Sequence, residues 1–293
     1  MTKVHLAGII PVANIVADFN IDIPEILLPL NKGLSAIQKS TVECAVAGCN
    51  TIWIVANDDV APILRATVGD WVHDPVYYSK RGGFSSEQRK EVPIYYVPVH
   101  PKDRDRRDSY GWSVLFGAHS AWKTSYNISQ WLTPEKYYVS FPLSAYDIYD
   151  LREYRKQIKQ KGKNFFLSYD GETVKNNKPI AFTFTGDDFK QCRRHINKIT
   201  TREFLPPSPD QRYPTQKLPL EERWSARHFE LQQVFEKVSE TNAVKINLDW
   251  YYDISSWSGY SDFVGSNFNI ETPPNYLTKP HKHVKIPYIE GEE

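Results

Sequence analysis

Short buried strands and amphipathic helices alternate along the first part of this chain. The apolar run Leu6–Pro11 predicts a first buried strand, and Thr51–Ala56 predicts a second. Between them, apolar residues recur at helical spacing over Ala36–Ala47. Gly48 follows directly, where a residue in the left-handed conformation commonly ends a helix.

The same alternation continues through the rest of the chain. Further strands are expected at Ile94–Pro98, Tyr137–Phe141 and Val244–Leu248, and further helices after Asp58-Asp59, from Gly111, and over Ile148–Ile158. Strands that alternate with helices favour a mostly parallel sheet covered on both faces. The pattern therefore predicts an α/β protein with a Rossmann-like, mostly parallel sheet flanked by helices.

The composition of the chain fits one large domain. Its 293 residues are 41% apolar and 14% aromatic, which is enough to bury a sizeable core. Five prolines between Leu205 and Pro219 predict an extended arm, because proline fixes φ and withholds a backbone donor. We expect a single α/β domain over 1–270, with the proline-rich arm at 205–219 and a C-terminal tail at 271–293.

Charge, hydropathy and cysteine content limit the kinds of binding partner and the cellular compartment that we expect for this chain. A formal net charge of +1 favours neither nucleic acid nor an anionic membrane surface as a global partner. The chain contains no run near the 18 or so apolar residues of a membrane span, and its start lacks the form of a signal peptide. Cys44, Cys49 and Cys192 show no metal-ligand spacing and fit reduced, packed thiols. We therefore expect a soluble cytoplasmic protein that has no membrane partner and no nucleic-acid partner.

Two segments resemble the sugar-phosphate nucleotidyltransferase family, also called nucleotide-sugar pyrophosphorylases. The stretch Asp249–Tyr260, with Asp253, Trp257 and Tyr260, resembles the family's closing "W-x-D-I-G-T-W-x-x-Y" element. Pro24–Leu30 resembles its "P-K-P-L-L-P-V" segment, and the order of elements matches over most of the chain. The resemblance implies a glycosyltransferase-A type fold, a nucleotide or nucleotide-sugar ligand, and a catalytic Mg²⁺ held in part by Asp253. From local sequence alone, Asp253 equally fits a turn residue or a helix cap.

Three departures from the family pattern affect the chemistry. The loop over residues 11–19 has neither the glycines nor the arginine of the family's "G-G-x-G-T-R" phosphate loop. Glu25 stands where the family has a phosphate-contacting lysine, and a carboxylate there would repel a triphosphate. Pro142 follows the strand where the family has its first metal-binding Asp, and the nearest carboxylate is Asp147. Asp147 is a candidate second metal ligand, although capping the next helix is the commoner role for such a residue.

Further candidates for ligand binding lie around the expected site. Gly8 in the first strand and Asn14 in the following loop are candidates by the resemblance. Gly111 precedes a helix that corresponds to a substrate-contacting helix of the family, although glycine there is also ordinary loop chemistry. Arg104 and Arg107 belong to a dense cluster of mixed charge that is either a solvated loop or a replacement phosphate clamp.

Two functions remain open from the sequence. One is a divergent nucleotidyltransferase that joins a sugar phosphate to a nucleoside triphosphate, dependent on Mg²⁺ if active. The other is a catalytically degenerate member of the same fold that binds a nucleotide or sugar, or serves as an oligomeric or assembly component. A glycosyltransferase with Asp103-Arg-Asp105 as its metal motif is a third, weaker reading. The chain also resembles, faintly, uncharacterised proteins of large tailed marine phages, which would place it in host cytoplasm or a virion.

Overall fold

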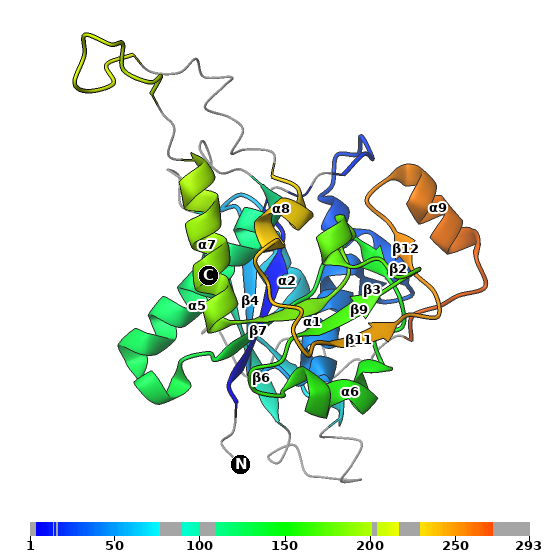
Figure 1. The fold of residues 1–293 in the computed structure, drawn as a ribbon. Coiled ribbons are helices and arrows are strands. Elements are labelled where there is room, and N and C mark those ends of the chain that lie inside the picture. The colour runs from blue at the N-terminus through cyan, green and yellow to red at the C-terminus, as the bar shows by residue number, and fades with distance from the viewer. Residues whose placement is uncertain are drawn as a thin grey trace, which may run out of the picture.

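The protein is built on a central eight-stranded sheet with helices on both faces (Figure 1). The computed structural model describes residues 4–13, 15, 17–76, 90–99, 109–200, 204–216 and 229–271. The strands lie in the order β11-β9-β10-β7-β1-β4-β6-β5. Neighbours from β7 through β1 and β4 to β6 are parallel, whereas β10 runs antiparallel to β7 and to β9, and β5 runs antiparallel to β6.

The strands of the central sheet are short, and most helices span two to five turns. The sheet comprises β1 (Leu6–Pro11), β4 (Thr51–Ala56), β5 (Trp71–His73), β6 (Glu91–Pro98), β7 (Lys136–Val139), β9 (Phe165–Ser168), β10 (Phe182–Thr185) and β11 (Val244–Asn247). Two small sheets pair β2 (Pro29–Asn31) with β3 (Leu34–Ser35) and β8 (Ser144–Ala145) with β12 (Tyr252–Asp253). The described helices are α1 (Ala36–Ala47), α2 (Ala61–Val68), α5 (Tyr110–Ile128), α6 (Leu151–Ile158), α7 (Gly186–Thr200), α8 (Leu231–Phe235) and α9 (Trp257–Gly265).

Alternate residues of the strands enter two separate hydrophobic cores. Leu6 and Ile10 of β1 and Tyr138 of β7 belong to the core beneath α1, α2 and α6. Ile9 and Tyr137 of the same two strands belong to the core beneath α5, α7 and α8. Successive side chains of a strand point to opposite faces, so a sheet covered on both sides buries every residue of its central strands. Figure 1 shows α5 and α7 on one side of the sheet and α1 and α6 on the other.

The structure confirms most elements of the first half and shifts one helix. The strands predicted at Leu6–Pro11 and Thr51–Ala56 form with those bounds, and Gly48 ends α1 with a φ of 91°. The helix expected from Ile148 begins instead at Leu151. The reason is a local turn, because Asp147 Oδ1 accepts the N–H of Tyr149 at 2.8 Å and keeps the preceding residues out of the helix.

The structure also bears on the cysteines and on membrane-spanning helices. Cys44, Cys49 and Cys192 are free and buried, as predicted. Across the described residues, the structure contains no helix with the length and apolar character needed to cross a membrane. The single-domain boundaries at 1–270 and 271–293 stay a prediction.

Candidate functional site at the carboxyl edge of the sheet

Beside β1, the chain adds strands in opposite directions across the sheet, first β4 on one side and later β7 on the other. The connection from β1 leads through α1 to β4 on one side, while β7 lies on the other side of β1. In open α/β sheets, ligands bind outside the carboxyl ends of the strands at such a reversal. Just past β1, the N–H groups of Val12 and Ala13 both donate to the Val55 carbonyl at 2.8 Å, so the chain turns over the end of β4.

Three polar side chains from distant segments lie near one another at this edge. Tyr110 opens α5, Tyr251 precedes β12, and Asp253 ends β12. The ring of Tyr110 packs against Phe141, which follows β7, with the ring centroids 5.3 Å apart. We call Tyr110, Phe141, Tyr251 and Asp253 the carboxyl-edge site.

The two phenol groups of this site are buried and have no hydrogen-bond partner among the described residues. Burial, and after it the negative charge of Asp253, raises the pKa of both Tyr110 and Tyr251 above its ordinary value. Both phenols therefore stay protonated at neutral pH and can donate hydrogen bonds. Asp253 is exposed and can accept them from a ligand.

The position of Asp253 is fixed by its own segment. β12 pairs with β8, which places Asp253 opposite Ser144, and Asp253 Oδ1 accepts the N–H of Ser255 at 3.0 Å. The first turn of α9 lies so close that a Cβ on Gly259 would approach the Asp253 carbonyl oxygen to 2.0 Å. Glycine is therefore required at 259 for this close approach.

The loop between β1 and α1 is hydrogen-bonded to, and packed against, the segment that carries Asp253. The N–H of Asp18 donates to the Ser255 carbonyl at 2.9 Å, and Phe19 contacts Trp257 edge-on with the ring centroids 5.8 Å apart. At the far end of the loop, the Tyr260 hydroxyl donates to the Pro29 carbonyl at 2.8 Å. The two segments that carry the family resemblance therefore lie against each other.

A buried ion pair supports the segment that follows β7. Lys39 and Glu43 of α1 are fully buried and pair at 2.9 Å. Lys39 Nζ donates to the Phe141 carbonyl at 3.3 Å and to the hydroxyl of Ser144 at 3.2 Å. Burial is the main reason that the pKa of Lys39 lies below its ordinary value, and the charge of Glu43 partly offsets that effect.

The carboxyl-edge residues fit a catalytic magnesium site poorly. Pro142 is buried at the position where the family has a metal-binding carboxylate. The Lys39 ammonium donates to the carbonyl oxygen of the preceding residue, Phe141, and its positive charge would repel a metal ion there. Asp147 does not act as the N-cap of α6, because its Oδ1 instead accepts the N–H of Tyr149. The described residues contain no group of three or more His, Cys, Asp or Glu side chains that could hold a metal ion. Magnesium prefers several oxygen ligands in octahedral geometry, which this donor set does not supply.

The two candidate glycines lie at close helix contacts. A Cβ on Gly8 would come within 2.9 Å of Cys44 Sγ, and one on Gly111 would come within 2.7 Å of Val234 Cγ2. Packing explains a glycine at each position. The candidates Asn14, Arg104 and Arg107, and the motif Asp103–Asp105, lie outside the described residues.

The two tyrosines were not identified from the sequence. Tyr110 lies next to the predicted Gly111, and Tyr251 lies two residues before Asp253, but tyrosines beside strands usually serve packing. Only the folded chain, which brings residues 110 and 251 near each other, shows that the negative charge of Asp253 acts on both phenol groups.

Comparison with solved structures finds the same fold in sugar-phosphate nucleotidyltransferases. A protein from Bacillus anthracis described as a glucose-1-phosphate thymidylyltransferase, solved with sucrose, aligns with a TM-score of 0.56 and 10% identity, over 91% of this chain and 98% of that one. An inositol-1-phosphate CTP transferase from T. maritima aligns with a TM-score of 0.47 and 10% identity, over 89% and 94% of the two chains. A UDP-glucose pyrophosphorylase complexed with UDP-glucose also gives 0.47, at 12% identity, over 89% and 97%. No family model and no curated protein matches the chain.

This chain therefore has the fold of the sugar-phosphate nucleotidyltransferases, as its sequence predicted. At 10% identity, the likeness to the Bacillus anthracis structure establishes the fold and nothing about the reaction. The resemblance to tailed-phage proteins gains no support from these structures and stays a prediction.

Proposed function

We propose that this protein binds a nucleotide sugar or nucleotide at the carboxyl-edge site and does not transfer a nucleotidyl group. The observation that carries the proposal is that Tyr110, Tyr251 and Asp253, from separate segments, lie near one another, and that neither phenol hydroxyl has a partner within the part of the chain that the structure describes. A buried hydroxyl without a partner costs about 1–3 kcal/mol of desolvation, so a ligand that accepts its hydrogen bond recovers that energy.

The donor and acceptor set suits a ligand rich in hydroxyl groups. Two neutral phenols supply donors, and the Asp253 carboxylate accepts from the hydroxyls of a ribose or hexose. Lys178 Nζ lies 5.4 Å from the ring centroid of Tyr251, but it pairs with Glu172 at 2.8 Å, so its charge is already balanced. Arg104 and Arg107 stay candidates for the phosphate groups.

The same set is poorly suited to nucleotidyl transfer. That reaction requires positive groups to stabilise charge as the phosphoryl group moves, and each such group is typically worth about 3 kcal/mol in the transition state. The loop after β1 contains no lysine or arginine. Glu25 stands where the family has a phosphate-contacting lysine, and Pro142 stands where the family has a metal-binding carboxylate. Binding is therefore the function that the geometry supports best.

Calorimetric titration of the full chain tests this proposal. The ligands are nucleoside diphosphates, nucleoside triphosphates and nucleotide sugars, each with and without Mg²⁺. We expect at least one of them to bind, and Tyr251→Phe and Asp253→Asn each to weaken its binding about tenfold, because each removes one hydrogen bond worth roughly 1.4 kcal/mol. Tyr251→Phe removes a hydroxyl that has no partner among the residues described, so it should leave the thermal stability of the free protein unchanged or slightly higher.

Two exposed positions provide matched controls. Tyr126→Phe on α5 and Asp262→Asn on α9 make the same chemical changes outside the carboxyl-edge site and should leave affinity unchanged. Failure of every ligand to bind, or equal weakening by the control variants, would contradict the proposal.

The transferase remains the second candidate, because Asp253 does lie at the carboxyl edge of a nucleotidyltransferase fold. If the protein is a transferase, incubation with a sugar 1-phosphate, a nucleoside triphosphate and Mg²⁺ should release pyrophosphate, and Asp253→Asn should abolish that release. Nucleotide-sugar binding without pyrophosphate release would favour the binding function.

A further inference from the structure

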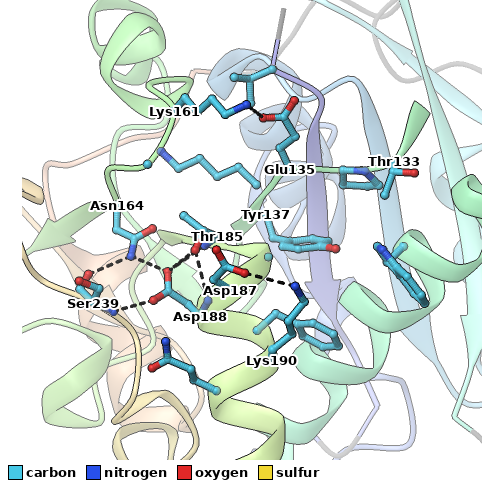
Figure 2. Close-up of a pocket in the computed structure, with 18 of the residues that line it drawn as sticks. Thr133, Glu135, Tyr137, Lys161, Asn164, Thr185, Asp187, Asp188, Lys190 and Ser239 are labelled. Atoms are coloured by element: carbon cyan, nitrogen blue, oxygen red, sulfur yellow. Dashed lines mark hydrogen bonds and ion pairs between the residues drawn. The ribbon is translucent and has the colours of Figure 1, made fainter. Parts of the chain in front are cut away.

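A pocket opens at the amino-terminal edge of the sheet, opposite the carboxyl-edge site (Figure 2). It lies among the starts of β7 and α7, the second half of α5, and the segments 161–164 and 239–241. Its volume of about 720 Å³ is in the range of small-molecule sites, roughly 300–1,000 Å³. We call it the amino-edge pocket.

One wall of the amino-edge pocket is aromatic. His119 stacks on Trp122 with the ring centroids 6.1 Å apart, and on Phe189 with the centroids 6.4 Å apart. Trp122 also stacks on Tyr126 at 5.5 Å, yet it is 40% exposed. The indole is therefore held in place by its neighbours while it lines the pocket, so little conformational entropy is lost when a ligand packs on it.

The charged side chains of the lining already have partners. Lys161 pairs with Glu135 at 2.8 Å, and Lys190 pairs with Asp187 at 3.2 Å, as Figure 2 shows. Lys136 Nζ donates to three carbonyl oxygens, those of residues 158, 160 and 163. Arg193 donates to His119 Nδ1 at 3.0 Å, which leaves the proton of a neutral imidazole on Nε2.

This charge arrangement disfavours an anionic ligand. Asp187 and Asp188 lie in the first turn of α7, where they offset the positive end of the helix dipole. To bind a phosphate, each lysine or arginine of the lining would have to break its present interaction with a carboxylate, a carbonyl oxygen or an imidazole. A neutral polar ligand leaves all these pairs intact.

The polar wall contains buried atoms that make no hydrogen bond to any described residue. Figure 2 shows Asn164, Asp188, Thr185 and Ser239 joined in one network, in which Asn164 Nδ2 donates to Asp188 Oδ2 and to the Ser239 carbonyl, both at 2.8 Å. Asn164 is 3% exposed, and its Oδ1 has no partner among the described residues. The hydroxyl of Tyr137, also in the lining, is likewise without one. Both atoms lie beneath the surface of the free protein, so a ligand hydroxyl or one bridging water reaches them only after a shift of the side chains that cover them.

We infer that the amino-edge pocket binds an uncharged saccharide, with a sugar ring packed on Trp122 and its hydroxyls directed to the Asn164 side. A pyranose has an apolar face of C–H groups and a rim of hydroxyls, which matches one aromatic wall and one wall of amide, hydroxyl and carboxylate groups. The site is separate from the carboxyl-edge site, because it lies where β1, β7 and β9 begin and not where they end.

Ligand-observed NMR and calorimetry with glucose, galactose, mannose and their disaccharides test the inference on the full chain. We expect at least one neutral sugar to bind, Trp122→Ala to weaken that binding tenfold or more, and Trp122→Phe to retain part of it. Tyr213→Ala also removes an exposed aromatic ring, in the loop at 205–216, and should change nothing. Circular dichroism checks that each variant is folded, which is expected because Trp122 is partly exposed.

The same titrations separate this inference from the proposed function. Asp253→Asn should weaken nucleotide-sugar binding and leave neutral-sugar binding intact, and Trp122→Ala should do the reverse. The inference is overturned if no neutral sugar binds, if Trp122→Ala leaves sugar affinity unchanged, or if only phosphorylated sugars and inorganic phosphate bind.

Discussion

The Glu43 carboxylate is the most heavily bonded buried side chain near the carboxyl edge. It pairs with Lys39, and it accepts hydrogen bonds from the hydroxyls of Tyr138, Ser140 and Tyr146, each at 2.7 Å. A buried charge is tolerated only when it is paired and its remaining lone pairs are satisfied, as they are here. Glu43 therefore acts as a positioning residue that joins α1 to β7 and to the segment carrying Phe141.

Replacement of Glu43 tests this role. Glu43→Gln leaves the Lys39 ammonium buried without a counter-charge, so we expect a loss of ~3–5 kcal/mol in the free energy of unfolding, measured by urea denaturation at pH 7. Glu153→Gln on the exposed face of α6 is the matched control and should shift the urea midpoint little. A loss below about 1 kcal/mol for Glu43→Gln would contradict the account.

Sequence alone could not identify this pair. Lys39 and Glu43 are four residues apart in a predicted helix, which is the usual spacing of a solvated surface ion pair. Their burial depends on Tyr138 and Tyr146, about 100 positions further along the chain. The same limit applies to Tyr110 and Tyr251, because no local pattern indicates which distant residue a side chain will meet.

At the scale of elements, the long buried runs were predictable and the short pairings were not. β1 and β4 form with their expected bounds because each is a run of six mainly apolar residues with no competing helical period. β8 and β12 have two residues each and pair across more than a hundred positions. Two residues carry no periodicity, so the strand that holds Asp253 in place could not be predicted.

Asp74 joins two elements through an ion pair with Arg155 of α6. The Arg155 guanidinium donates to both oxygens of Asp74, at 2.9 and 2.6 Å, just after β5, and Lys90 adds a contact at 3.1 Å. Burial alone would raise the pKa of Asp74, but the bonds and charges of Arg155 and Lys90 outweigh it and lower the pKa below its ordinary value.

This shift predicts a pH-dependent contribution to stability. A carboxyl group with a lowered pKa in the folded state stabilises the protein above its unfolded pKa, and that contribution is lost as pH falls through the folded pKa. Asp74→Asn should therefore cost ~2–3 kcal/mol at pH 7 and progressively less between about pH 4 and pH 2, measured as urea midpoints. Asp70→Asn, which removes the exposed partner of Arg65, is the control and should have little effect at either pH. A cost that is equal at pH 7 and pH 2 would refute the role of this ion pair.

For the whole molecule, the fold is shared with nucleotidyltransferases, whereas the residues at the carboxyl edge differ from the family pattern. The sheet order and its reversal beside β1 match those expected of a nucleotidyltransferase fold, so the carboxyl edge is where a ligand should bind. The groups that would drive the reaction are replaced by Glu25 and by Pro142, whereas two tyrosines and one aspartate meet at the same edge. Hydrophobic patterning predicted an α/β sheet flanked by helices, and the resemblance of two motif segments predicted the particular fold. The function stayed open because it depends on single side chains.

The most direct test is hydrogen exchange, followed by mass spectrometry, of the full chain with and without the nucleotide sugar that binds most tightly in the titrations. We expect slower exchange in two separate segments, 251–259 and 110–114, because the ligand would contact Tyr251, Asp253 and Tyr110 and order their backbones. The fastened loop near Asp18 should be protected to a smaller extent. Unchanged exchange in both segments at saturating ligand, or protection confined to the amino-edge pocket, would contradict nucleotide-sugar binding at the carboxyl edge.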